Sequence, residues 1–392
     1  MTGRERNILL LTVVAHALVH IFDGMIAPLI PLLVREFNTD FFRVGIVVSM
    51  FSILFGAGAL PAGLIADRLG PRRLISAYLI GAGALFLAVG AAGGLWVYGA
   101  LMAGAGLFCS TYHPAANTLI GKEIAERGNA FGIHGIAGSL GTAAAPVIVA
   151  WLGSRAGWRA PHMMFGAIAV GVGLISLRLP VRAPDVVRSR VAGPLKSYAP
   201  VLSLVAFYLA AGILGLAYRG TMTFLPAFMG ERIVVAGVDS VTTGGMMATL
   251  TLLSGAVGQY VGGRLTDRMA PEPLYVIALV VSTVFLFLVL VGTPVLLVIS
   301  AAIFALFYFA VQPIQNDILA RYVAPDSLGA AYGLHFLVVF GAGAFAGAGG
   351  GYLADRFGLA AVFVATLVCF VIATALIVVV TALRARVEVP AE

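Results

Sequence analysis

The sequence predicts an all-α membrane protein in which twelve transmembrane helices form two pseudo-symmetric six-helix bundles. The first indication is composition: 61% of the 392 residues are hydrophobic and only 10% are charged, whereas a soluble domain carries about 25% charged residues. The second is the length of the apolar runs, about 20 residues or more, which as helix crosses about 30 Å of hydrocarbon. Because lipid offers no partner to free backbone groups, these runs are expected to be helical.

The order of the apolar runs predicts the domain organisation. The first run is too long for the core of a cleaved signal peptide, so we expect it to be retained as the first helix. Connections are short except at a segment that holds proline, glycine and several basic residues. We expect an N-terminal bundle over 1–180, a cytoplasmic linker over 181–198 and a C-terminal bundle over 199–392. The expected spans are 8–34, 44–66, 73–93, 96–119, 130–152, 161–180, 199–225, 240–264, 273–291, 294–320, 328–351 and 359–383.

The basic residues predict the orientation of the chain in the membrane. If both termini lie in the cytoplasm, 17 of the 24 Lys and Arg fall on the cytoplasmic side and six on the opposite side, while Arg219 lies inside a span. Such an excess in cytoplasmic loops is the usual bias of membrane proteins. The net charge of +7 therefore reflects orientation in lipid, and no nucleic-acid partner is expected.

Three pairs of matching segments indicate that the two halves are copies of one six-helix unit. Each pair occurs in the same order in both halves. Internal repeats of this kind place the site of a secondary transporter between the halves, near the middle of the bilayer. The pairs are GLIADRLGPRR (63–73) with GGRLTDRMAPEP (262–273), PAANTL (114–119) with PIQNDI (313–318), and FGIHG (131–135) with YGLHF (332–336).

The segment after the second span carries the pattern G-x-x-x-D-R-x-G-x-R-R, which resembles the signature of the major facilitator superfamily. The second copy keeps Asp267 and Arg268 but lacks the later glycine and basic pair. STYHPAANTLIGKE and GNAFGIHGIAGSLGTAAAPVI are similar to the fosmidomycin-resistance type of efflux protein in that superfamily. The resemblance implies the major facilitator fold, alternating access, antiport and a bacterial cytoplasmic (inner) membrane. The residues of the pattern are Gly63, Asp67, Arg68, Gly70, Arg72 and Arg73.

The charges of this pattern are expected to form a gate at the cytoplasmic face. A carboxylate there can accept hydrogen bonds from a helix N-terminus or from an arginine of the other half. Such a contact would hold one conformation and break in the other. The alternative is that these charges only set the topology. The expected gate residues are Asp67, Arg68, Arg72, Arg73, Asp267 and Arg268.

A polar column in the first span is the strongest candidate for function. His16, His20 and Asp23 follow one another at i, i+4 and i+7, so they lie on one face of a helix. An ionised Asp at the centre of a bilayer costs about 2.5–3.5 kcal/mol, so this face is expected to point into the protein. Proton coupling or substrate binding and a purely structural polar network are the two main interpretations. No resident metal or cofactor is expected, although the column could offer three ligands to a transition metal.

Arg219 is the base expected to complement this column. It lies in the seventh span, the repeat mate of the first, and DGMIAPLIP (23–31) aligns with RGTMTFLP (219–226) so that Asp23 stands opposite Arg219. A paired charge is far less costly in a membrane interior than an unpaired one. We expect Asp23 and Arg219 to interact directly or through substrate. Further residues expected to line the same cavity are Tyr112, His113, Gln312 and Asn316.

These features predict a secondary active transporter and not an enzyme. The chain contains no G-x-x-x-x-G-K-[ST] motif for binding ATP phosphates and no convincing nucleophile for an intramembrane enzyme. We expect proton-coupled export of a small amphipathic or anionic compound by a monomer whose partners are substrate, protons and lipid. The alternatives are uptake or exchange of an organic anion, and transport of a transition-metal ion through the same cavity.

Overall fold

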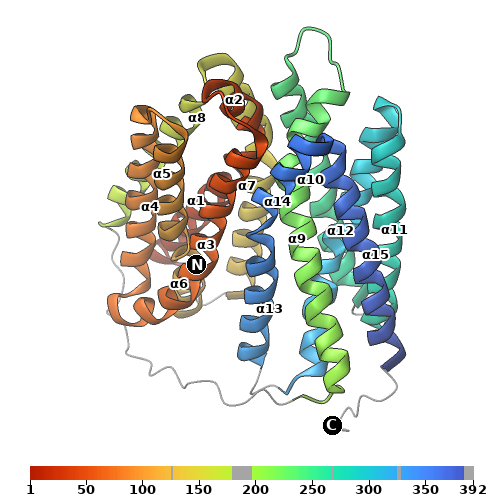
Figure 1. The fold of residues 1–392 in the computed structure, drawn as a ribbon. Coiled ribbons are helices and arrows are strands. Elements are labelled where there is room, and N and C mark those ends of the chain that lie inside the picture. Colours follow the sequence, from red (N-terminus) through yellow and green to blue (C-terminus); the bar gives the residue numbers. More distant parts are fainter. Residues whose placement is uncertain (125–126, 179–196, 267, 325–327, 384–392) are drawn as a thin grey trace. The chain divides into compact units, whose positions relative to one another are not determined.

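The computed structural model describes residues 1–124, 127–178, 197–266, 268–324 and 328–383. Throughout these ranges the chain is almost entirely helical (Figure 1). Twelve helices within the described chain are long and apolar enough to cross a membrane. The predicted number of spans is therefore confirmed, and the protein is a multi-pass membrane protein.

The elements follow one another in a simple order, and several expected spans consist of two or three shorter helices. They are α1 (Gly3–Asp23), η1 (Ala27–Leu29), α2 (Ile30–Glu36), α3 (Phe41–Leu69), α4 (Pro71–Ala88), η2 (Val89–Ala91), α5 (Leu95–Cys109), α6 (Tyr112–Glu123), α7 (Arg127–Ala156), α8 (Arg159–Ser176), α9 (Val201–Arg232), α10 (Ser240–Thr266), α11 (Pro271–Val291), α12 (Pro294–Tyr322), α13 (Leu328–Gly343), α14 (Ala346–Phe357) and α15 (Leu359–Leu383).

The first span begins earlier than its hydrophobicity predicts. The apolar run starts at Ile8, but α1 starts at Gly3 because Thr2 and Glu5 form a capping box. In this arrangement the Thr2 hydroxyl accepts from the Glu5 backbone N–H, and the Glu5 carboxylate accepts from the Thr2 backbone N–H. Arg4 also forms an ion pair with Glu123 at the end of α6. The polar start of the chain is thus part of the first helix.

The first span is broken at the end of the polar column. α1 ends at Asp23, and a 3₁₀ turn at Ala27–Leu29 leads into α2. Pro28 and Pro31 are the second residues of these two elements, within the first turn, where a proline costs no backbone hydrogen bond. The same prolines within one continuous helix would each remove a hydrogen bond and clash with the preceding turn. The apolar run at 8–34 is therefore a discontinuous helix.

The fourth span has a second break, next to His113. α5 ends at Cys109 and α6 begins at Tyr112, with a turn at Ser110 and Thr111. Pro114 lies in the first turn of α6, where its missing N–H does least harm. Both breaks therefore lie close in sequence to histidines of the expected site.

The described chain groups into two compact units. One comprises Met1–Ser189, Thr223–Thr249 and Gly347–Tyr352, and the other comprises Arg190–Met222, Leu250–Ala346 and Leu353–Glu392. Most of the expected linker, 181–196, lies outside the described residues. The division into bundles at 1–180 and 199–392 therefore stays a prediction.

Packing within the first unit fixes the position of α1, the helix that carries the polar column. α1 packs on α7, and α4 packs on α5 and α8. The buried rings of Phe22 and Phe86 stack with centroids 4.1 Å apart, and the Tyr78 hydroxyl donates to the Ala15 carbonyl at 3.1 Å. Aromatic packing and this hydrogen bond hold the α1 backbone in register beside α4.

Candidate functional site: a histidine cluster in the first unit

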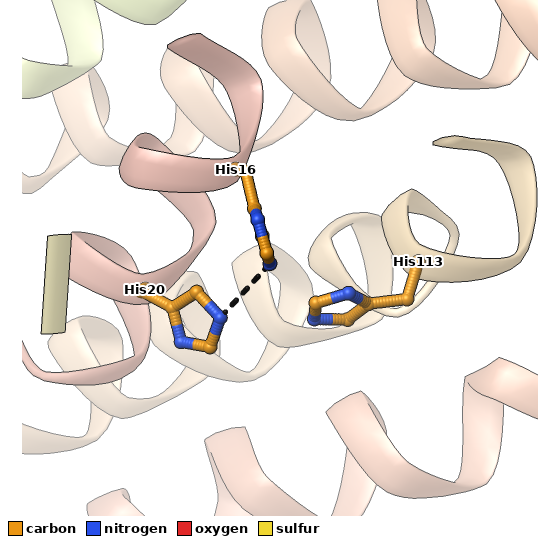
Figure 2. A group of neighbouring side chains, drawn as sticks. All are labelled: His16, His20 and His113. Atoms are coloured by element: carbon orange, nitrogen blue, oxygen red, sulfur yellow. Dashed lines mark hydrogen bonds between the residues drawn. The ribbon is translucent and has the colours of Figure 1, made fainter. Parts of the chain in front are cut away.

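Three histidine side chains from two helices point into one space. His16 and His20 lie one turn apart on α1, and His113 lies in the first turn of α6 (Figure 2). Their candidate ligand nitrogens all lie within 4.8 Å of one another. His16 is buried, while His20 and His113 are half-buried. The sequence predicted the His16–His20 neighbourhood from helical spacing, and the fold adds His113.

Hydrogen bonds determine which nitrogen of His16 carries a proton. His16 Nδ1 lies 2.6 Å from the His134 carbonyl oxygen, and a carbonyl can only accept, so Nδ1–H is the donor. Neutral His16 then has an unprotonated Nε2. That Nε2 lies 3.2 Å from His20 Nε2, so His20 must be the donor of the second bond.

The network continues through His134 and Tyr112. The Tyr112 hydroxyl donates to the Thr12 carbonyl at 2.6 Å, which uses its one hydrogen. Its oxygen therefore accepts from His134 Nε2–H at 2.8 Å. The rings of His16 and His134 also stack, with centroids 3.9 Å apart and planes 10° from parallel. The rings of His16 and His20 thus share a hydrogen bond, whereas His16 contacts His134 through the His134 backbone carbonyl and through ring stacking.

The direction of these hydrogen bonds makes the network sensitive to one added proton. A protonated His16 would donate from both ring nitrogens, and His20 would then have to accept at Nε2. The hydrogen bond between His16 and His20 would reverse, and His20 would have to change tautomer. Protonation of His16 and rearrangement of its hydrogen bonds are therefore chemically linked.

A glycine on α7 makes room for the His16 ring. A Cβ at Gly138 would lie 2.4 Å from His16 Cε1 and 2.7 Å from its Nε2, far inside normal contact. The ring therefore occupies the space that a side chain on α7 would need. This close approach of α1 and α7 brings His16 within reach of the His134 carbonyl.

Asp23 lies at the break that ends α1, three residues after His20. Its carboxylate interacts electrostatically with the His113 imidazole and with the Cys109 thiol. The side chain is half-buried. Asp23 thus lies at the end of an interrupted helix, beside the histidine cluster. This agrees with the expectation that an acidic side chain in a membrane span faces the protein and not the lipid.

Three further residues that the sequence predicts to line a cavity lie in the second unit. Gln312 is exposed on α12 and its Oε1 accepts from Gln259 Nε2 at 2.5 Å. Asn316, one turn later, and Arg219 on α9 are half-buried. Asp23 belongs to the first unit and Arg219 to the second, so their expected interaction stays a prediction.

The structure describes three of the six expected gate residues. Arg72 Nη1 donates to the carbonyls of Ser176 and Leu177 at 3.3 and 2.6 Å, and these carbonyls end α8, where backbone acceptors lack helical partners. Arg73 and Arg268 are exposed. Arg72 therefore caps a neighbouring helix within its own unit. The side chains of Asp67, Arg68 and Asp267 lie outside the described residues, and the gate stays a prediction.

His134 lies in the repeated segment FGIHG and is not among the residues expected at the site. The structure makes it the direct partner of His16 and Tyr112. No spacing signal could have joined His16 to His134, because they are 118 residues apart and on different helices. The only relevant signals were that both residues are histidines in apolar spans and that FGIHG recurs in the second half.

Twelve apolar helices, two of them interrupted beside a buried polar network, define a polytopic membrane protein of the secondary-transporter class. The chain matches the Major Facilitator Superfamily over residues 12–348 and 207–392. It belongs to that family, whose members are transporters and not enzymes.

Curated relatives are similar to parts of the chain. The membrane sensor protein UhpC of Salmonella typhimurium is 27% identical over 134 residues, which cover 34% of this chain and 30% of UhpC. The probable sulfoacetate transporter SauU of Cupriavidus necator is 25% identical over 61% of this chain and 59% of its own. The multidrug resistance protein MdtG of Serratia proteamaculans is 26% identical over 69% of this chain and 68% of its own. The chain thus spans less than two thirds of the length of the first two.

A solved structure confirms the fold over the full length. The crystal structure of a bacterial homolog of the human lysosomal transporter Spinster aligns with a TM-score of 0.86 and covers 100% of both chains at 18% identity. At that identity the likeness concerns the fold alone. The predicted major facilitator fold is therefore confirmed.

Proposed function

We propose that the protein is a secondary active transporter that exports a small amphipathic or anionic compound in exchange for protons. It would work by alternating access, as a monomer, in a bacterial cytoplasmic membrane with both termini on the cytoplasmic side. The observation that carries the proposal is the directed histidine network beside Asp23, at the interrupted end of α1. Buried ionisable groups in a membrane interior are costly and typically mark ion pathways.

Asp23 is the proposed proton carrier. Burial favours the neutral form of any carboxyl group and a nearby cation favours the charged form, so a carboxyl group whose surroundings change during transport can bind and release a proton. The half-buried position of Asp23 at a helix break leaves room for such a change. His16, His20 and His113 would pass protons to and from this carboxylate through their exchangeable ring hydrogens.

Arg219 is the proposed partner of the substrate anion or of Asp23. It lies on α9, the repeat mate of α1, at the position that aligns with Asp23. The similarity to SauU supports an anionic substrate, and the similarity to MdtG supports export. The resemblance of the fourth and fifth spans to the fosmidomycin-resistance type of efflux protein also supports export. Tyr112, Gln312 and Asn316 would complete the substrate cavity.

The charges around the α3–α4 and α10–α11 connections are the proposed cytoplasmic gate. Asp67 and Asp267 would accept from basic residues in one conformation and release them in the other. Arg72 holds the end of α8 through two carbonyls, so a moving α4 would carry α8 with it. This coupling supports a gate in which the two helices move together.

The test is transport in proteoliposomes with an imposed pH gradient and a panel of organic anions and amphipathic drugs. We expect the gradient to stimulate transport of at least one compound, and Asp23→Asn to abolish the stimulation. Asp317→Asn is the matched control, because Asp317 pairs with Arg321 at 2.8 Å near the end of α12. Unchanged gradient-driven transport in Asp23→Asn would refute the coupling role.

A further inference from the structure

We propose that His16, His20 and His113 form a reversible binding site for a divalent transition-metal ion of the Zn²⁺ type. The site goes beyond the proton-coupled transport proposed above and does not depend on it. Imidazole nitrogens suit Zn²⁺, Cu²⁺ and Ni²⁺, whereas Mg²⁺ and Ca²⁺ require oxygen ligands. A cluster of three imidazoles therefore selects a transition metal.

The spacing of two nitrogens already matches a metal site. Two nitrogens that bind one tetrahedral Zn²⁺ at about 2.0–2.1 Å lie about 3.3 Å apart. His16 Nε2 and His20 Nε2 are 3.2 Å apart, where one shared hydrogen now joins them. Replacing that hydrogen by a metal ion needs little movement of either ring.

His113 supplies the third nitrogen from the other helix. Its ring meets that of His16 edge-on, with centroids 5.3 Å apart, and lies 5.6 Å from the centroid of His20. All three ligand atoms are within 4.8 Å of one another, so a rotation of the half-buried His113 side chain closes the triangle. Figure 2 shows the three rings directed at this common space.

The groups around His16 resemble those behind a metal ligand. Metal-binding histidines almost always donate their second ring N–H to a carbonyl or carboxylate, which fixes the tautomer. His16 Nδ1–H donates to the His134 carbonyl at 2.6 Å, and His16 Nε2 faces His20. The ring is also stacked on His134 and packed against Gly138. The correct nitrogen of His16 is thus held in place before any ion arrives.

Charge balance favours the same assignment. Three neutral imidazoles leave the two positive charges of the ion uncompensated, which is expensive in a membrane interior. The Asp23 carboxylate already acts electrostatically on His113, so it supplies negative charge beside the site. Three protein ligands leave a fourth position for water or substrate, as in exchangeable zinc sites.

Metal titration of the full-length protein in lipid nanodiscs tests this site. Isothermal titration with Zn²⁺ is expected to give one ion per chain, and His20→Ala or His113→Ala should weaken its Kd at least about tenfold. The matched control is His162→Gln. His162 lies in the same unit, but Tyr98 and the Trp158 carbonyl occupy its two ring nitrogens, so its replacement should leave Zn²⁺ binding unchanged.

A second variant and a second metal separate ligation from simple misfolding. His113→Cys, under reducing conditions, should keep Zn²⁺ binding because a thiolate also binds Zn²⁺. Co²⁺ in the wild type should give the visible absorption of a tetrahedral complex. Absence of stoichiometric binding, or binding that His20→Ala and His113→Ala leave intact, would overturn the proposal. Neither readout involves transport, so the outcome is independent of the substrate and of proton coupling.

Discussion

The two copies of a six-helix repeat that the sequence predicts have matching helices but different side-chain chemistry. α1, α6 and α7 carry the connected histidine network, whereas α9, α12 and α13 occupy the same places in the repeat and carry none of its three clustered histidines. The difference indicates that the fold needs the helices but not the imidazoles. From the aligned segments, His16 corresponds to Gly212, His20 to Leu216 and His113 to Gln312.

Packing shows how one copy came to accommodate a histidine. In the first copy the small residue lies on α7, where Gly138 leaves space for His16 on α1. In the second copy the residue aligned with His16 is Gly212 on α9, where a Cβ would be 2.9 Å from Val338 Cγ1 on α13. Close helix contact is kept in both copies by a glycine on opposite partners. The position of the glycine thus decides which helix can carry a large polar side chain.

His134 and the aligned His335 show the same difference in chemistry between the two copies. Both are buried near the start of equivalent helices. His134 hydrogen-bonds to Tyr112, whereas the ring of His335 stacks on Phe207 with centroids 5.7 Å apart. Val311 stands where the first copy has Tyr112, so the second copy lacks this hydroxyl partner. The same residue is part of a polar chain in one copy and of an aromatic contact in the other.

The largest effect is expected from replacing Gly138 on α7 by valine, the residue that the second copy has at the aligned position, Val339. Gly138→Val should displace the His16 ring, at a cost of about 1–3 kcal/mol or more for overpacking, and lower the melting temperature. Gly171→Val is the control, because nothing lies within 4 Å of a Cβ there. Adding His16→Gly, as in the second copy, should restore much of the stability. If the double variant is no more stable than Gly138→Val, then the His16 ring is not what competes with the new side chain for space.

A smaller effect is expected from removing one buried tyrosine hydroxyl in each copy. Tyr112→Phe breaks two hydrogen bonds and leaves buried groups on His134 and Thr12 without their partner, which costs about 1–3 kcal/mol. Tyr308→Phe removes one bond, to the Leu214 carbonyl at 2.9 Å. Thermal unfolding should therefore show a larger loss in the first copy. Equal losses would mean that the Tyr112 network adds no stability beyond a single bond.

The smallest effect concerns a feature that both copies share. Asp40 and Asp239 precede the equivalent helices α3 and α10 and accept from the backbone N–H of Arg43 and Thr242, at 2.7 and 2.9 Å. Replacing either by Ala should cost about 0.5–2 kcal/mol, near the lower end for an exposed cap. A difference well above 1 kcal/mol between the two variants in thermal unfolding would show that this cap is not equivalent in the copies.

The Asp239 cap should also respond to pH. Partial burial opposes ionisation of Asp239, but hydrogen bonds from Thr242 and Ser154 outweigh it and lower the pKa of this carboxyl. A lowered folded pKa means that the ionised cap stabilises above the unfolded value of about 3.9 and loses this contribution as pH falls below it. The gap in stability between wild type and Asp239→Ala should therefore narrow below about pH 4. A constant gap down to pH 3 would contradict this.

The spans could be predicted because length and hydrophobicity alone decide whether a helix crosses lipid. The break after Asp23 was not predicted, because hydrophobicity alone does not distinguish a continuous helix from one that is interrupted near Pro28 and Pro31. The His16–His20 contact follows from one turn of helix. The additions of His113 and His134 depend on how α6 and α7 pack against α1, which helical spacing within one segment does not encode.

We propose that the proton-coupling chemistry belongs to the first copy of the repeat. The most direct test replaces His20 by Leu and His113 by Gln, the residues of the second copy, and compares two modes of transport in proteoliposomes. We predict that transport driven by a pH gradient is lost while substrate counterflow, which needs no proton movement, persists. Gradient-driven transport at the wild-type rate in this double variant would contradict the account.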